Sequence, residues 1–120
     1  MESTGLSVVV AFIQPFQLER VIDALRHAEH CPGVSVTEVR GMGSTRAHPP
    51  RRGERTEVVP LEQAVRLEIF CASVDAVPLA DVIRTHAHTG HAGDGKVFVC
   101  PVTDAARIRT GAHGADALHP

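Results

Sequence analysis

The sequence lacks the features that define several large classes of protein. It has no tryptophan and no tyrosine, and aromatic residues make up only 3% of its 120 positions. No run approaches the roughly 20 apolar residues that a membrane-spanning helix needs. The N-terminal stretch MESTGLSVVV lacks the basic region that opens a signal peptide. We therefore expect a cytoplasmic protein without membrane insertion.

Excess positive charge and patterned cysteines are also missing. The formal net charge is -2, whereas a nucleic-acid-binding domain carries a clustered basic face, so we expect no nucleic-acid partner. The three cysteines, Cys31, Cys71 and Cys100, are odd in number, widely spaced and without a C-x-x-C pair. This pattern indicates neither a disulfide framework nor a zinc site.

The composition is that of one globular domain, with 43% hydrophobic and 22% charged residues. Its first forty residues predict a strand, a helix and a second strand. Leu6 to Phe12 is a short apolar run, and from Phe16 to Ala28 apolar residues recur every three or four positions, as on one helix face. Val34 to Arg40 alternates apolar and polar residues, as a half-buried strand does.

The second half repeats this order after a long irregular segment. Gly41 to about Ala64 is rich in Gly, Pro and Arg, and so long a loop in a small domain is usually functional or disordered. Val65 to Ser73 alternates like a strand. Asp75 is expected to cap a helix that has Pro78 in its first turn, and Lys96 to Val102 predicts the last strand.

The order βαββαβ predicts a ferredoxin-like α+β domain over residues 1–120, with a four-stranded antiparallel sheet and two helices on one face. The other face of such a sheet is bare. A partner must cover it, so we expect a homo-oligomer.

The stretch TGHAGDGKVFV, residues 89–99, begins like a phosphate-binding P-loop but has Val97 where that motif needs Ser or Thr. A P-loop also opens a helix, whereas this stretch leads into a strand. A plain turn without a ligand is one interpretation. The other is an anion-binding nest built from Gly90, Gly93 and Gly95, beside Lys96, the only lysine among twelve basic residues.

The C-terminal ARIRTG contributes a second positive group. Arg107 and Arg109 are two positions apart and would point to one side of an extended backbone. Two adjacent guanidinium groups repel each other unless an anion or an acidic partner lies between them. Solvated surface arginines are the alternative.

Together, GDGK and RIRTG, in order after Pro15-Phe16, VTEVRG and VRLEIF, resemble the PII signal-transduction family over nearly the whole chain. The resemblance implies a homotrimer that binds ATP or ADP, possibly with magnesium, in the clefts between subunits. It also implies a partner-binding T-loop at about residues 41–64, a B-loop at about 89–96 and a C-loop at about 107–114.

The resemblance further implies which residues contact the nucleotide. Gly93, Gly95 and Lys96 would hold phosphates, and Arg107 and Arg109 would reach the same nucleotide from the adjacent subunit. The implied nucleotide-binding set is Ser35, Gly41, Glu68, Thr89, Gly93, Asp94, Gly95, Lys96, Arg107 and Arg109.

Within that set, Ser35 and Glu68 fall at the adenine and ribose end of the family's site, and Asp94 is a turn residue rather than a catalytic one. Nothing in the chain offers a nucleophile with a base. We therefore expect a regulator, in which any slow ATP hydrolysis would be incidental.

Some positions depart from the family's pattern. Thr45 stands where a glutamine helps chelate Mg-ATP, and Ala64 stands where a lysine meets 2-oxoglutarate, so weak or absent 2-oxoglutarate binding is expected. The chain has no tyrosine, so modification of a T-loop tyrosine is excluded. Gln14 replaces a residue that is usually basic in relatives.

The apex of the expected T-loop, around Pro49-Pro50, is basic, which suits an acidic partner surface as well as it suits a solvated loop. The candidate partner-binding residues are Arg46, His48, Arg51, Arg52 and Arg55. The partner is an unidentified regulated protein, and a membrane transporter is one possible class.

His86, His88 and His91 could gather a transition metal, although their spacing matches no established metal motif. The alternative function is therefore a sensor of another small ligand or metal in the same fold, linked to transport or efflux. A nucleotidase is a third and weaker alternative.

Overall fold

The computed structural model describes residues 4–42 and 60–119. Its four strands are β1 (Leu6–Ile13), β2 (Ser35–Gly41), β3 (Glu62–Ala72) and β4 (Gly95–Pro101). Its helices are α1 (Leu18–His27), preceded by the 3₁₀ helix η1 (Pro15–Gln17), α2 (Ser73–Ala87) and a C-terminal 3₁₀ helix, η2 (Gly114–Leu118). This is the expected βαββαβ order.

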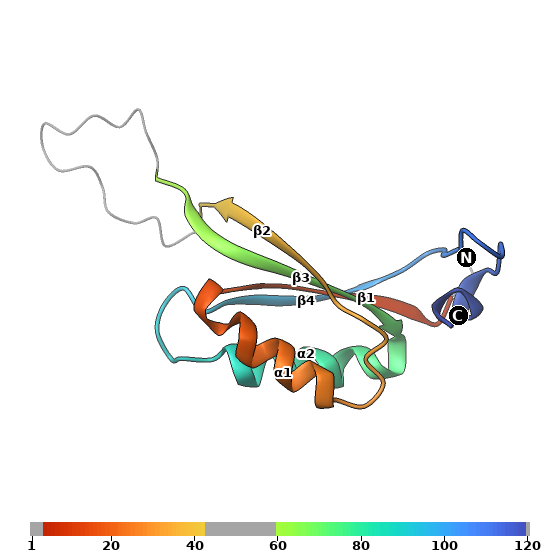
Figure 1. Ribbon diagram of the computed structural model, residues 1–120, viewed down its shortest axis with the longest axis horizontal. Coiled ribbons are helices and arrows are strands. Elements are labelled where there is room, and N and C mark those ends of the chain that lie inside the picture. The colour runs from red at the N-terminus through yellow and green to blue at the C-terminus, as the bar shows by residue number, and fades with distance from the viewer. Residues whose placement is uncertain (1–3, 43–59, 120) are drawn as a thin grey trace, which may run out of the picture.

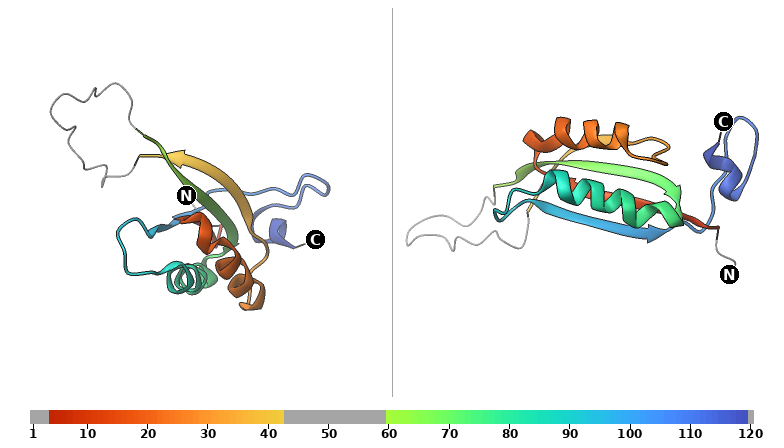
Figure 2. Two further views of the ribbon diagram at one scale, coloured as in Figure 1. Left: turned by 60° about the vertical axis from the view of Figure 1, so that its left-hand side comes forward. Right: turned by 90° about the horizontal axis from the view of Figure 1, so that it is seen from below.

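The strands form one antiparallel sheet in the order β2-β3-β1-β4, and both helices cover the same face (Figures 1 and 2). The ferredoxin-like prediction is therefore confirmed. β1 and β3 lie in the centre, so their alternate residues are fully buried. The core is formed by Val9, Ala11, Ile13, Val21, Leu25, Val65, Leu67, Ile69, Cys71, Ala76, Leu79, Ile83 and Ala87.

The opposite side, here called the open face, carries apolar side chains that the described part of the chain leaves partly exposed. Val8, Val10 and Phe12 alternate with the buried residues of β1, and the register places Phe70 and Phe98 beside Val8 and Val10. Phe70 is 49% exposed and Phe98 47%. A sheet face of this composition favours association with another apolar surface.

Two local predictions are wrong. Asp75 does not cap α2, because β3 runs directly into the helix with Ala72 as its N-cap, and Asp75 lies in the first turn. The Ser73 amide donates instead to the carbonyl of Gly5, 2.7 Å away. Since this contact satisfies one of the free N–H groups of the first turn, no capping side chain is needed there. Pro78 consequently lies inside the helix.

Strand β2 is also more exposed than its alternating pattern predicted. It is an edge strand, paired only with β3, and six of its seven residues are exposed in the single chain. The prediction of a half-buried strand assumed a neighbouring layer over β2, which the single chain does not supply.

The strand β3 begins earlier than the sequence predicted, inside the segment that was expected to be the long loop. Glu62 pairs with Gly41, so Glu62, Gln63 and Ala64 continue β3. This extension carries no apolar run, and only its pairing with β2 makes it a strand. Thr45 and all five candidate partner-binding residues lie outside the described residues. The five candidates are Arg46, His48, Arg51, Arg52 and Arg55.

No helix within residues 4–42 and 60–119 is both long and apolar enough to cross a membrane.

Candidate functional site

The glycine-rich loop, residues 89–96, lies between α2 and β4, at the end of the sheet where β2 ends and β3 begins (Figure 1). Three of its glycines have positive φ angles: Gly90 at 88°, Gly93 at 94° and Gly95 at 107°. At Gly95 a Cβ atom would stand 1.7 Å from the backbone oxygen of Phe12. The loop therefore requires glycine both for its dihedral angles and for its close approach to β1.

The Asp94 carboxylate organises this loop from inside. It accepts hydrogen bonds from the backbone amides of Thr89, at 2.7 Å, and Gly90, at 2.9 Å, and from the Thr89 hydroxyl. These bonds, with the Thr89 hydroxyl first, hold the pKa of Asp94 below its ordinary value, and His88 at 3.8 Å acts in the same direction. The prediction that Asp94 is a turn residue agrees with these contacts.

Not every amide of the loop is available to an anion. The amides of Thr89 and Gly90 are taken by Asp94, and that of His91 donates to the Thr89 hydroxyl. The nest expected from the glycines is therefore smaller than Gly90 to Gly95. Residues 92 and 93 form a turn that engages the amide of Asp94, and within the described part of the chain the amides of Ala92 and Gly93 have no protein acceptor.

Gln14, at the end of β1, fixes the other side of the loop. Its Nε2 donates to the carbonyl of Gly93, 2.6 Å away, across a separation of 79 residues. The sequence identified Gln14 only as an unusual residue and did not predict this contact. The side-chain amide of Gln14 thus holds the centre of the glycine-rich loop against the end of β1.

A groove of about 480 Å³, here called the stem groove, lies between the glycine-rich loop and the base of the long loop. Lys96 extends from β4 into its lining, next to Phe12, its partner in the sheet register. Ala64 contributes only a methyl group. The full lining of the stem groove consists of Phe12, Ile13, Gln14, Val39, Arg40, Gly41, Met42, Glu62, Gln63, Ala64, Gly93, Gly95, Lys96 and Phe98.

Ser35 and Glu68 lie directly opposite each other in the β2–β3 ladder. The Glu68 carboxylate receives the Nε–H of Arg66 at 2.9 Å, and the Arg66 guanidinium stacks 5.6 Å from the ring centre of Phe12. Ser35 is six residues from Gly41, which is about 20 Å along a strand. The expected adenine end of the site therefore lies far from the stem groove of the same chain.

The two arginines are farther away still. After β4 the chain forms a hook, residues 106–113, closed by a bridge between Ala106 and His113 and by a 2.8 Å bond from the Arg107 amide to the Ala112 carbonyl. Residues 108–110 form a turn, so the extended geometry that would align Arg107 with Arg109 is not present. The hook leaves the sheet at the end opposite the glycine-rich loop (Figures 1 and 2).

Arg107 carries an unsatisfied group. Its Nε is buried and has no hydrogen-bond acceptor among the described residues. The adjacent Ile108, by contrast, is fully exposed. A buried guanidinium N–H without an acceptor is costly, so the Arg107 side chain is incompletely satisfied within the described part of the chain.

The histidines do not form a metal site in the described part of the chain, where no group of three His, Cys, Asp or Glu side chains converges. His86 donates its Nδ1–H to the Val82 carbonyl, 2.8 Å away on the same helix. His88 faces Asp94 at 3.8 Å, and His91 is exposed.

These features define a ferredoxin-like α+β domain in which a glycine-rich loop and the base of a long loop share one groove. The model of the family described as nitrogen regulatory protein P-II matches residues 6–112. The chain therefore belongs to the P-II family of signal-transduction regulators, as the resemblance indicated.

Known proteins agree with this assignment. The chain is 42% identical over 115 residues to the nitrogen regulatory protein GlnK2 of Haloferax mediterranei, covering 95% of this chain and 92% of that protein. It is 37% identical over 110 residues to the nitrogen regulatory protein P-II of Azospirillum brasilense, covering 92% and 97%. Among solved structures, Arabidopsis thaliana PII bound to citrate superposes with a TM-score of 0.71 at 31% identity, covering 93% of this chain and 91% of that one.

Proposed function

We propose that the protein is a trimeric regulator that binds ATP or ADP between neighbouring subunits and controls a partner protein through its long loop. The separation of the candidate residues carries this proposal. Lys96 and Pro101 are five residues apart on β4, about 17 Å, and Arg107 lies beyond the far end of that strand. Because one chain cannot bring Lys96 and Arg107 to one ligand, a shared nucleotide requires a second subunit.

Each half of the site has a feature suited to an anionic ligand. Among the described residues of the glycine-rich loop, the amides of Ala92 and Gly93 are without an acceptor, and they lie in the same loop as the ammonium of Lys96. The hook offers Arg107, whose buried Nε has no acceptor in the described part of the chain. Triphosphate oxygens between these halves would satisfy both and would be bound by charge-assisted hydrogen bonds.

The open face supports the trimer. Phe12 and Phe98 already pack edge to face, with ring centres 6.5 Å apart, and Phe70 and Phe98 remain about half exposed. Contact between open faces of three subunits would remove this apolar surface from water. We place the trimer in the cytoplasm, as expected from the sequence, and assign it no catalytic role of its own.

The lining of the stem groove supports the expectation that 2-oxoglutarate binds weakly or not at all. At Ala64 the wall of the groove supplies a methyl group and no cation, and of the two cations that line the groove, Arg40 and Lys96, the proposal assigns Lys96 to the phosphates. Calorimetry in the presence of ATP is expected to show no binding of 2-oxoglutarate at micromolar concentration, and tight ATP-dependent binding would refute this part of the proposal.

The central test is thermal stabilisation by nucleotide, followed by complementation between subunits. ATP or ADP should raise the melting temperature, because a ligand that binds only the native state stabilises it. Lys96→Ala and Arg107→Ala should each abolish most of that shift, whereas Arg26→Ala, an exposed arginine on α1, should leave it unchanged.

Co-expression of the two defective variants then distinguishes a shared site from a site within one chain. In a mixed trimer, some clefts contain the Lys96 of one subunit and the Arg107 of its neighbour, so nucleotide binding should be partly restored. A site within one chain would gain nothing from mixing. If neither ATP nor ADP stabilises the wild-type protein, the proposed function is wrong.

A further inference from the structure

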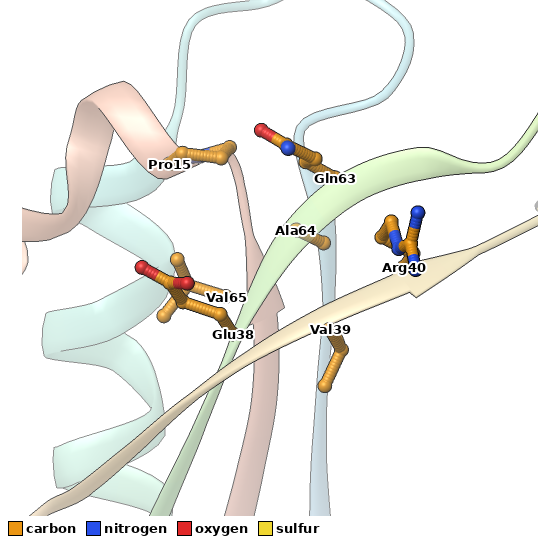
Figure 3. Close-up of a pocket in the computed structure, with 7 residues that line it drawn as sticks. All are labelled: Pro15, Glu38, Val39, Arg40, Gln63, Ala64 and Val65. Atoms are coloured by element: carbon orange, nitrogen blue, oxygen red, sulfur yellow. The ribbon is translucent and has the colours of Figure 1, made fainter.

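A second groove, here called the lateral groove, lies between the start of η1, the last part of β2 and the first part of β3. Its volume is about 420 Å³, within the usual range for a small-molecule site. Figure 3 shows its lining, in which Pro15 faces the ends of the two strands. The residues that matter for its chemistry are Pro15, Glu38, Arg40, Gln63 and Val65.

The lateral groove lies at the end of the sheet and shares Val39, Arg40, Gln63 and Ala64 with the stem groove, but its charged residues are on the side opposite the open face. Glu38 pairs with Val65 and Arg40 with Gln63 in the β2–β3 register. Val65 is 3% exposed and packs in the helix-covered core, so by strand alternation all four residues share that side. Glu38 and Arg40 therefore lie on the side of the sheet away from the open face on which the proposed trimer is built.

The groove holds one negative and one positive side chain that do not neutralise each other. Glu38 and Arg40 are two residues apart on one side of β2, about 7 Å along the strand. Neither forms an ion pair within 4.0 Å with any residue in 4–42 or 60–119. Gln63 adds an amide with no hydrogen bond to that part of the chain, and Pro15 and Val65 add an apolar wall.

We propose that the lateral groove binds a small zwitterion, an α-amino acid with a short apolar or amide side chain. The Arg40 guanidinium can bind a carboxylate through two N–H groups, and the Glu38 carboxylate can accept hydrogen bonds from an α-ammonium group. A simple anion would be repelled by Glu38, and a simple amine would be repelled by Arg40. Only a molecule that carries both charges matches both residues.

The position of this site gives it a regulatory role, which rests on the proposed function. Arg40 and Gln63 form the rung before Gly41 and Glu62, the last pair before the long loop. A ligand that bridges β2 and β3 there favours one arrangement of the loop base. Since coupling between two ligands is reciprocal, an effect of the amino acid on nucleotide affinity implies an equal effect of nucleotide on amino-acid affinity.

The test is a titration of the ¹⁵N-labelled full chain with L-norvaline, followed by NMR and performed without nucleotide. Saturable shifts are expected for the amides of residues 38–40 and 63–65. Pentanoate, which lacks the ammonium group, and butylamine, which lacks the carboxylate, should each bind at least about tenfold more weakly. The absence of nucleotide keeps this result independent of the proposed function.

Matched variants test the negative residue, Glu38, and the positive residue, Arg40, separately. Glu38→Gln and Arg40→Gln should each weaken norvaline binding at least about tenfold, whereas Glu29→Gln and Arg26→Gln, exposed charges near the end of α1, should have no effect. All four positions are exposed, so the variants should keep the dispersed spectrum of the folded chain. Absence of saturable shifts, equal binding of pentanoate, or unchanged binding by Glu38→Gln would each overturn the proposal.

Discussion

The glycine-rich loop and the C-terminal hook, at opposite ends of the sheet, differ in how completely a single chain satisfies them. In the loop, Asp94 and Gln14 bind the amides and carbonyl that hold its shape. In the hook, backbone bonds close the turn, but Arg107 keeps a buried Nε without an acceptor in the described part of the chain, and Ile108 is fully exposed. The loop is thus held in shape within one chain, whereas the hook leaves a buried N–H group unsatisfied within the described part of the chain.

This difference predicts separate consequences of mutation. Changes inside the loop should damage the folded subunit itself, because its contacts are made within one chain. Changes in the hook should leave the subunit folded and damage assembly or ligand binding.

The largest effect is expected from Gly95→Ala. The new methyl group would meet the Phe12 backbone oxygen, and the φ angle of 107° is unfavourable for any side chain. We expect the free energy of unfolding to fall by about 3 kcal/mol or more, measured by urea denaturation. Gly33→Ala is the matched control, since nothing lies within 4 Å of its added Cβ. Equal stability of both variants would show that the loop is not held against β1.

Ile108→Glu tests the hook. Burial of an isoleucine contributes about 1.5–3 kcal/mol, so if the hook packs on a neighbouring subunit, the charged variant should weaken assembly by at least about tenfold in dissociation constant. Analytical ultracentrifugation measures this. Val74→Glu on α2, where the native side chain is 84% exposed, is the control. Should both variants assemble like the wild type, Ile108 is not an assembly contact.

Much of the fold could be predicted from local sequence patterns. The apolar run of β1 and the three-and-four spacing of α1 each match the observed elements within two residues, because burial on one side imposes those periods. The start of β3 at Glu62 could not be predicted in this way. Its residues are exposed or half-buried and become a strand only through pairing with β2.

The candidate site shows the same division. Glycines followed by a single lysine were visible in the sequence because backbone conformation and charge are local properties. The bond from Gln14 to Gly93 and the packing of Arg66 on Phe12 join residues far apart in the chain. No local pattern marks such contacts, since the fold alone brings those residues together.

The smallest expected effect is a pH dependence that originates in the glycine-rich loop. Hydrogen bonds from Thr89 and Gly90 hold the pKa of Asp94 below its ordinary value of 3.8. A carboxyl group whose pKa is lower in the folded state stabilises the fold above the unfolded pKa, and this contribution is lost as the pH falls through the folded pKa. Asp94→Asn removes the titrating group.

Melting temperatures of the wild type and Asp94→Asn, measured from about pH 6 to about pH 3, should therefore converge as the pH falls below about 4. Asp104→Asn is a suitable control, because that carboxylate is exposed and its partners among the described residues are the amide of its neighbour Ala105 and the exposed His113, 3.7 Å away. A constant difference between wild type and Asp94→Asn across this range would mean that the ionised carboxylate is not what holds the loop. Since the contacts of Asp94 are made within one chain, the same convergence is expected when Arg107→Ala is added to both proteins, and this comparison separates a property of the subunit from one of the proposed assembly.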